Sequence, residues 1–181
     1  MERETKETIV LNSTPLIYLS KAGLIEKLVE IFKIRITSSV YREVVINGKK
    51  IGAPEANVVE SLISSGAISI EEDPEDTSLI SETYKLGLGE SSTMLLASNI
   101  NCVAIIDDER ARKVGKTLGV NIHGTLFLLK LMLILDIVSI IELKEKLEEM
   151  IQEGFRIASE VMIKFIKDAE NQAKHRQTHT H

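Results

Sequence analysis

Apolar residues are arranged along the chain in two kinds of pattern. Short continuous runs predict buried strands, and stripes at every third or fourth position predict amphipathic helices. The expected strands cover residues 8–11, 34–37, 67–70, 103–106 and about 120–122. The first expected helix begins at Pro15, after an N-cap at Thr14. Further helices are expected at 24–32, 38–46, 54–64, 78–86, 90–97 and 108–118. Strands that alternate with helices indicate βαβ units, so we expect an α/β fold whose parallel sheet carries helices on both faces.

Beyond residue 126 the pattern is purely helical. Apolar stripes at 126–135, 140–151 and 157–166 are typical of core or dimer packing. We therefore expect one domain over 8–169, with a helical C-terminal part at 126–169. Residues 170–181 are polar and aperiodic, and we expect a disordered tail there whose histidines have no function: His175, His179 and His181.

Two polar segments between these elements are expected to be loops. Residues 47–50 (NGKK) combine Asn and Gly with two lysines, and residues 71–76 (EEDPED) are acidic around a proline. Ser38 or Ser39 is the expected cap of the helix 38–46, which precedes the first of these segments. We expect the acidic segment to be solvated.

Composition narrows the compartment and the mode of binding. The net charge of −5 argues against a surface that binds nucleic acid by overall attraction, so any such binding must be local. A single cysteine, Cys102, indicates a reducing compartment, and we expect the cytoplasm. The N-terminus is charged, and Lys130 and Asp136 interrupt the apolar stretch 126–141, so we expect neither a signal peptide nor a membrane span.

The segment VAIIDDERAR at 103–112 is the strongest candidate for chemistry. An apolar strand ends there in two adjacent carboxylates, Asp107 and Asp108, and a basic amphipathic helix follows. Open α/β sheets bind their ligands at the carboxyl ends of their strands. Asn12, Glu43 and Glu90 also lie where a strand ends or a helix begins.

These side chains together predict a divalent metal site. Their oxygen atoms are hard ligands that prefer Mg²⁺ or Mn²⁺, and His123 is the sole histidine outside the tail. A metal held by a few carboxylates can activate water against a phosphodiester. The basic residues of the following helix are candidates for contacts to RNA phosphates: Arg110, Arg112 and Lys113.

Each of these residues also has a simpler interpretation. An acid in the first turn of a helix contributes about 0.3 to 1 kcal/mol through the helix dipole and capping. Taken singly, Glu90, Asp107 and Asp108 are more often caps than ligands. Basic residues at this spacing usually form the solvated face of a helix.

Four segments taken in order resemble a known family, namely IVLNSTPLIYLSK, VYREV, LGLGESSTMLLA and AIIDDERARKVGKTLGVNIHGT. The sequence resembles the PIN-domain nucleases, specifically their prokaryotic VapC-like branch. The resemblance implies a three-layer α/β/α sandwich with four to five parallel strands, RNA hydrolysis with Mg²⁺ or Mn²⁺, a homodimer and a protein antitoxin as partner.

The resemblance also assigns roles to single residues. Asn12 falls on the first acid of the family, Thr14 on its hydroxyl companion, Glu43 on the second acid and Glu90 on the third. Asp107 falls on the fourth, and Asp108 can substitute for it. The family usually has Asp where this chain has Asn12, and an amide oxygen can ligate a metal but brings no charge.

Three hypotheses follow from the sequence. The first is a metal-dependent ribonuclease of the VapC-like toxin type that hydrolyses RNA with Mg²⁺ or Mn²⁺. The second is a module of the same fold, catalytically weak or inactive, that binds nucleic acid or protein, which Asn12 and the acidic net charge would explain. The third, from fold analogy alone, is a phosphate-handling doubly wound enzyme or receiver domain, although the sequence has neither a phosphate-binding P-loop nor an aspartate after the first strand.

Overall fold

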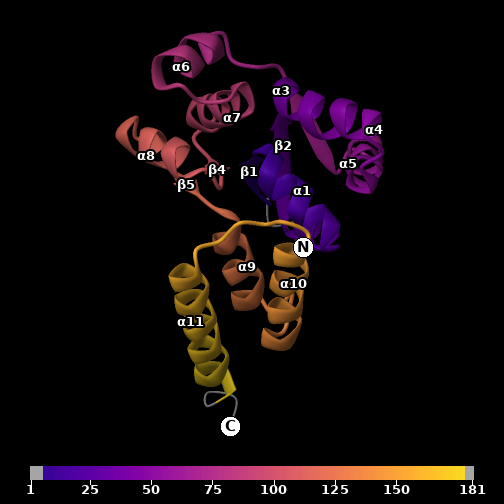
Figure 1. Cartoon of the computed structure of the whole chain (residues 1–181), viewed down its shortest axis with the longest axis vertical. Coiled ribbons are helices and arrows are strands. Elements are labelled where there is room, and N and C mark those ends of the chain that lie inside the picture. The colour runs from indigo at the N-terminus through magenta and orange to yellow at the C-terminus, as the bar shows by residue number, and fades with distance from the viewer. Residues whose placement is uncertain (1–5, 178–181) are drawn as a thin grey trace, which may run out of the picture. The chain divides into compact units, whose positions relative to one another are not determined.

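The computed structural model of the protein describes residues 6–177 (Figure 1). Contacts between residues divide the chain into two compact units, Met1–Thr125 and Leu126–His181. The second unit begins at the residue where we expect the purely helical part of the chain. Both units contain buried apolar side chains.

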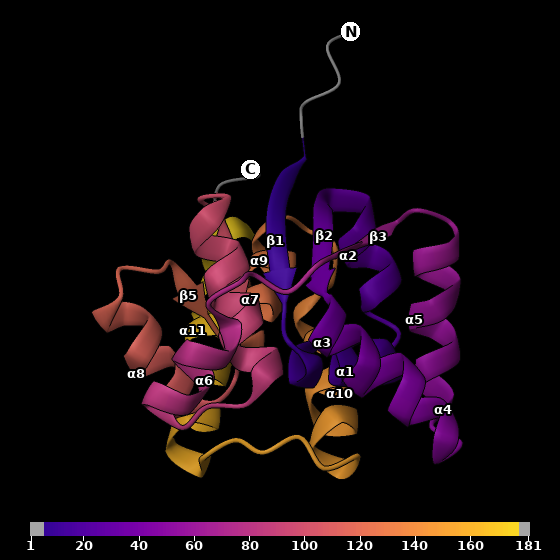
Figure 2. The same cartoon turned by 90° about the horizontal axis from the view of Figure 1, so that it is seen from above.

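The first unit is built on one parallel sheet. Its strands are β1 (Glu7–Leu11), β2 (Phe32–Thr37), β3 (Ile68–Glu71), β4 (Val103–Ile105) and β5 (Ile122–His123). They lie in the order β3-β2-β1-β4-β5, and each neighbouring pair is parallel. Figure 2 shows β1, β2 and β3 side by side. The expected α/β fold with a parallel sheet of four to five strands is confirmed.

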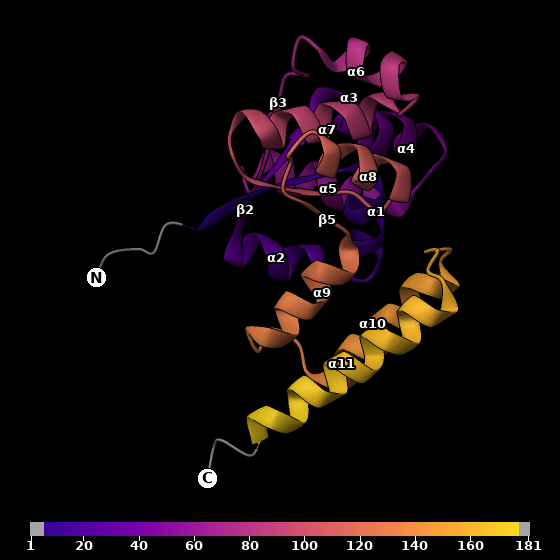
Figure 3. The same cartoon turned by 90° about the vertical axis from the view of Figure 1, so that its left-hand side faces the viewer.

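Helices cover both faces of this sheet. α7 packs on β1, β2 and β4, and α8 on β5, whereas α2 contacts β2 and α5 contacts β3. Figure 3 shows α7 and α8 on one side of the sheet and α2 on the other, which gives the three layers of an α/β/α sandwich. The helical segments are α1 (Ser13–Lys21), α2 (Ile25–Ile31), α3 (Ser38–Tyr41), the π-helix η1 (Arg42–Asn47), α4 (Gly48–Lys50), α5 (Pro54–Ser64), α6 (Thr77–Tyr84), α7 (Leu88–Asn99) and α8 (Glu109–Thr117).

The direction of strand order reverses between β1 and β4. From β1 the chain proceeds to β2 and β3, then crosses the sheet to β4 and continues to β5. Leu11 pairs with Ile105, and the Asn12 amide donates a 3.0 Å hydrogen bond to the Ile105 carbonyl. Such a reversal, outside the carboxyl ends of the strands, is where open parallel sheets bind their ligands. The residues that follow β1 and β4 therefore meet at one edge.

Most helix boundaries differ from the prediction by one or two residues, and two of the differences concern an expected cap and an expected loop. The N-cap of α1 is Asn12, so Thr14 is its second residue and not its cap. Pro15 is compatible with this position because the first amides of a helix have no intrahelical partner. Residues 47–50, expected as a loop, are helical because η1 and α4 both pack against α5.

The core on the α7 side of the sheet joins this helix to the central strands. Val10, Met94, Ala97, Ala104 and Ile106 all have 0% of their surface exposed. Central parallel strands are buried on both faces, which is why β1 and β4 appear in the sequence as continuous apolar runs. The packing of α7 on β1 and β4 therefore fixes the start of α7 relative to the strand ends.

The second unit contains α9 (Thr125–Ile134), α10 (Ile140–Gln152) and α11 (Ser159–Gln177). α9 begins at the last residue of the first unit. The apolar stripe predicted on α10 is buried, as shown by Leu143, Leu147 and Met150. On α11, Phe165 and Ala169 are buried.

The helix α11 extends past residue 170, where the disordered tail was expected. Residues 170–177 are helical, which corrects the prediction for that part of the tail. Ala169 is buried, and the Glu170 carboxylate pairs with Lys144 of α10, so this region of α11 has partners that its sequence does not reveal. His175 lies on α11, whereas His179 and His181 lie outside the described residues. No helix in the described part of the chain is long and apolar enough to cross a membrane.

The buried side of α7 can be tested by shortening one side chain. We expect Met94→Ala to lower the free energy of unfolding by about 2 to 5 kcal/mol, because it leaves a cavity in a fully buried site. Leu79→Ala on α6 is the control, since 61% of the Leu79 surface is exposed and its loss should cost much less. Urea unfolding of both variants checks this, and equal losses would contradict it.

Candidate active site

Asn12 lies directly after β1 at the central edge of the sheet. Its backbone is extended, its side chain makes no capping hydrogen bond to α1, and only 5% of its surface is exposed. Asn12 Oδ1 has no hydrogen-bond partner among the described residues. A buried carbonyl oxygen without a donor is costly, so this atom is suited to a ligand that accepts its lone pairs.

Glu43 reaches the same place from η1. Ser13 Oγ donates a hydrogen bond to Glu43 Oε2. A Cβ atom added at Gly89 would lie 2.8 Å from Glu43 Oε2 and 3.1 Å from Asn12 Oδ1. The two oxygen atoms therefore converge on the main chain at Gly89, and only glycine leaves them room. Glu43 sits in a π-helical segment, a distortion that is frequent at functional sites.

Glu90 follows Gly89 in the first turn of α7. Its Oε2 accepts a 2.9 Å hydrogen bond from the Gly87 amide, so Glu90 caps α7 as the simpler interpretation predicts. Burial raises the pKa of Glu90, and the negative charges of Asp108 and Glu43 raise it further, against the opposing effects of the Gly87 amide and Arg110. The charges of Glu43 and Asp108 therefore act on the Glu90 carboxylate.

The adjacent residues Asp107 and Asp108 differ in their surroundings. Asp108 is exposed, is the N-cap of α8 and accepts a 2.7 Å hydrogen bond from the Ala111 amide. Both carboxylate oxygens of Asp107 are engaged by Thr125, through its amide at 2.7 Å and its hydroxyl at 2.6 Å. Burial raises the pKa of Asp107, while these two bonds and Arg112 oppose the rise.

The three basic candidates on α8 also differ. Arg110 is exposed and lowers the pKa of Glu90 through its positive charge. Lys113 forms a 2.7 Å ion pair with Glu109, and both side chains are 74% exposed. Arg112 is half-buried, and its Nη1 donates hydrogen bonds to the carbonyls of Ile106, at 3.2 Å, and Asp107. Only Arg112 therefore has its guanidinium directed at the main chain.

The donor chemistry of this edge fits a hard divalent cation. Oxygen atoms are offered by Asn12, Glu43, Glu90 and Asp108, and among the residues that the structure describes Asn12 Oδ1 has no hydrogen-bond partner. The carboxylates do not meet at a single point, since the described residues include no group of three His, Cys, Asp or Glu side chains arranged to hold a metal. Glu43, Glu90 and Asp108 instead accept hydrogen bonds from Ser13, Gly87 and Ala111, respectively.

Asp73 supports the position of Glu43 in a way that the sequence did not reveal. It lies in the acidic segment expected to be a solvated loop, but accepts hydrogen bonds from the Ser39 amide at 2.9 Å and the Ser39 hydroxyl at 2.5 Å. It also pairs with Arg42 at 3.2 Å. The N-cap of α3 is Thr37, one residue before the predicted serines. Asp73 thus holds the beginning of the helical segment that leads into Glu43.

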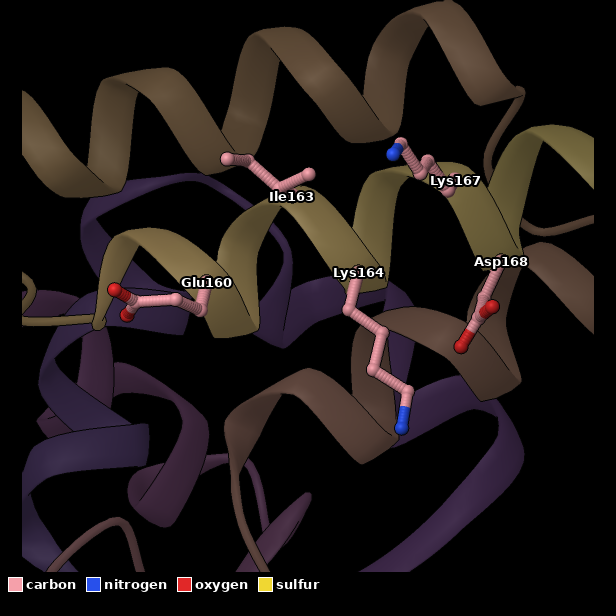
Figure 4. A pocket seen from close by; sticks show the side chains of 5 residues that line it. All are labelled: Glu160, Ile163, Lys164, Lys167 and Asp168. Carbon is pink, nitrogen blue, oxygen red and sulfur yellow. The ribbon is translucent and has the colours of Figure 1, made fainter.

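The pocket shown in Figure 4 shares no lining residue with this site. It is lined by side chains of α11 alone: Glu160, Ile163, Lys164, Lys167 and Asp168. None of the candidate residues described above lines it.

Comparison with known proteins identifies the family to which the chain belongs. The model of a family described as DUF3368, a PIN domain, matches residues 8–171. A search of curated proteins returns no match. The crystal structure of PAE2754 from Pyrobaculum aerophilum is similar to this chain with 13% sequence identity and a TM-score of 0.49, and the alignment covers 68% of this chain and 95% of that one.

The raised pKa of Glu90 predicts a pH-dependent difference between the protein and Glu90→Gln. Glutamine can still accept the Gly87 hydrogen bond, so the cap is retained. The folded protein binds the Glu90 proton more tightly than the unfolded chain, whose pKa is near 4.5. The unmutated protein should therefore lose stability relative to the variant as pH rises from below 4.5 through the raised pKa.

The measurement is urea unfolding with EDTA at about pH 4 and about pH 7, on either side of this interval. The advantage of Glu90→Gln in unfolding free energy should be larger at the higher pH. The same advantage at both pH values would contradict the assigned environment of Glu90.

Proposed function

Because the chain belongs to the DUF3368 family of PIN domains, we propose that it is a metal-dependent ribonuclease of the VapC-like toxin type. The convergence of Asn12 Oδ1 and the Glu43 carboxylate on Gly89 is the observation that carries the proposal. It supplies the beginning of an oxygen-donor site at the strand edge where open parallel sheets generally bind their ligands. Glu90 and Asp108 lie within electrostatic reach and add charge.

In this proposal four side chains would hold Mg²⁺ or Mn²⁺: Asn12, Glu43, Glu90 and Asp108. A divalent cation at this site supplies Lewis acidity toward the phosphodiester. Glu90 accepts the Gly87 amide through Oε2, which leaves Oε1 available to take a proton from the attacking water.

Of the adjacent aspartates, we assign Asp108 to the site. Asp107 has both carboxylate oxygens occupied by Thr125, whereas Asp108 uses one for its cap and acts on the pKa of Glu90. Arg110, on the same turn of α8, would contact a phosphate of the RNA beside these acids. With a net charge of −5, binding of RNA would depend on such local contacts.

The VapC-like type would also bring a protein antitoxin, a homodimer and a cytoplasmic location. These expectations follow from the branch of the family, and the single Cys102 is compatible with a reducing compartment.

A second function is a binding module of the same fold that does not cleave RNA. It is favoured by Asn12, which brings no charge, and by the hydrogen bonds that occupy Glu43, Glu90 and Asp108 within the protein. The two functions differ in one measurable outcome, the hydrolysis of RNA in the presence of metal.

The test is incubation of mixed-sequence RNA oligonucleotides with the purified protein in Mg²⁺ or Mn²⁺. We expect cleavage that Asp108→Asn lowers by roughly a hundredfold, the scale of a single electrostatic contact in catalysis. Asparagine caps a helix as well as aspartate, so α8 should keep its stability. Asp76→Asn, at the N-cap of α6, is the control that removes the same charge elsewhere. No cleavage by the unmutated protein in either metal would favour the binding module.

A second prediction concerns the first acid of the family. Asn12→Asp should strengthen Mn²⁺ binding by at least about tenfold, because it adds a charge beside Glu43 in a buried position. Titration calorimetry measures this without RNA. Asn57→Asp, at an exposed position in the first turn of α5, adds the same charge away from the site and should change nothing. Equal Mn²⁺ affinities for the protein and both variants would remove Asn12 from the site.

A further inference from the structure

Arg112 differs from the other basic residues of α8 in where its charge is directed. Its Nη1 donates to the carbonyl of Ile106 at 3.2 Å and to that of Asp107, the two residues that follow β4. Ile106 is fully buried, and a buried carbonyl needs a donor to offset its loss of water. A phosphate contact made through this nitrogen would take its hydrogen bonds away from both carbonyls.

The side chain of Asp107 holds the same turn through hydrogen bonds to a different residue, Thr125. Its two carboxylate oxygens accept the Thr125 amide and hydroxyl, so the end of β4 is tied to the residue that begins α9. A Cβ atom at Gly124 would lie 3.0 Å from Asp107 Oδ1 and 3.2 Å from Arg112 Nη1. The carboxylate and the guanidinium are therefore close neighbours over Gly124. We call Asp107, Arg112 and Thr125 the bracket.

The bracket determines where Asp108 can lie. Asp108 follows directly on the two clamped residues, its own carbonyl accepts the Arg112 amide at 3.0 Å, and its side chain accepts the Ala111 amide. Little freedom remains in the main chain on either side of it. A change that loosens Ile106 and Asp107 would therefore displace Asp108 without touching it.

We propose that Arg112 is a positioning residue, which together with Asp107 and Thr125 fixes the turn that presents Asp108, and that it does not contact RNA phosphate. The sequence alone assigned Arg112 to phosphate contact, because its place on a basic helix does not reveal which carbonyls lie beside it. The part of the proposal that concerns metal rests on the proposed function, whereas the part that concerns the turn does not.

The first test uses amide hydrogen exchange in the metal-free protein. Arg112→Met removes the donor and retains the apolar stem, and Lys113→Met removes the same charge from an exposed position on the same helix. We expect Arg112→Met to speed the exchange of the Thr125 and Ala111 amides by roughly tenfold or more, relative to amides of β2. Lys113→Met should leave both unchanged. Unchanged exchange in Arg112→Met would overturn the proposal.

The second test separates positioning from phosphate contact. Arg112→Met should weaken Mn²⁺ binding by roughly tenfold or more, the usual effect of removing a group that supports a metal ligand. The slope of log affinity for single-stranded RNA against log salt should stay the same. A fall in that slope by about 0.7, the contribution of one phosphate contact, would overturn the proposal.

Thr125 provides a matched pair should Arg112→Met fail to fold. Thr125→Val removes only the hydroxyl bond to Asp107, and Thr125→Ser keeps it. Faster exchange at Ala111 and weaker Mn²⁺ binding in the valine variant, with recovery of both in the serine variant, would support the bracket. Absence of both effects in the valine variant would overturn it. If the unmutated protein binds no Mn²⁺, the proposed function fails, and the exchange rates still decide whether Arg112 positions the turn.

Discussion

The pairing of β1 with β4 is the interaction on which the rest of the site depends. These strands are remote in sequence, and the hydrogen bond from the Asn12 amide to the Ile105 carbonyl places their ends at one edge. Val10, Leu11, Ala104 and Ile105 are fully buried, two on each face of the sheet. A slip by one residue would exchange the faces and set each side chain against the wrong helix layer, so close packing on both faces holds the register. With the register fixed, Asn12 and the Asp107–Asp108 turn are neighbours before any side chain contributes.

In this protein, helix capping and the gathering of acids at the strand edge are one arrangement. The sequence offers them as alternatives, since Glu90 and Asp108 both lie at helix beginnings. The structure shows that Glu90 caps α7 and Asp108 caps α8 while the charge of Asp108 acts on Glu90. A cap fixes a carboxylate with one oxygen and leaves the other. Helix N-termini gathered at a strand edge thus hold acids close together at little extra cost.

The fold followed from the sequence to the extent that it depends on local periodicity. Buried parallel strands appear as apolar runs, so the strands and most helices were predicted in their correct order. What the sequence could not provide are contacts between distant segments. Asp73 accepts a hydrogen bond from the Ser39 amide, 34 positions away, and Glu170 pairs with Lys144, 26 positions away. The bonds from Arg112 to the carbonyls of Ile106 and Asp107 are short in sequence, but they depend on the path of the turn after β4, which residue spacing does not give. The different surroundings of Asp107 and Asp108 depend on Thr125, 18 residues from Asp107, which is why spacing left that pair unresolved.

The close approach of Gly89 has a further consequence for the size of anything held at this edge. The wall opposite Asn12 and Glu43 is main chain, and main chain is positioned by the packing of α7 on β1, β2 and β4. Discrimination between ions of different radius would then be a property of the protein core, set by the volumes of buried side chains such as Met94. A conservative exchange in that core, far from any charged atom, is a way for the site to be widened or narrowed while every ligand stays the same.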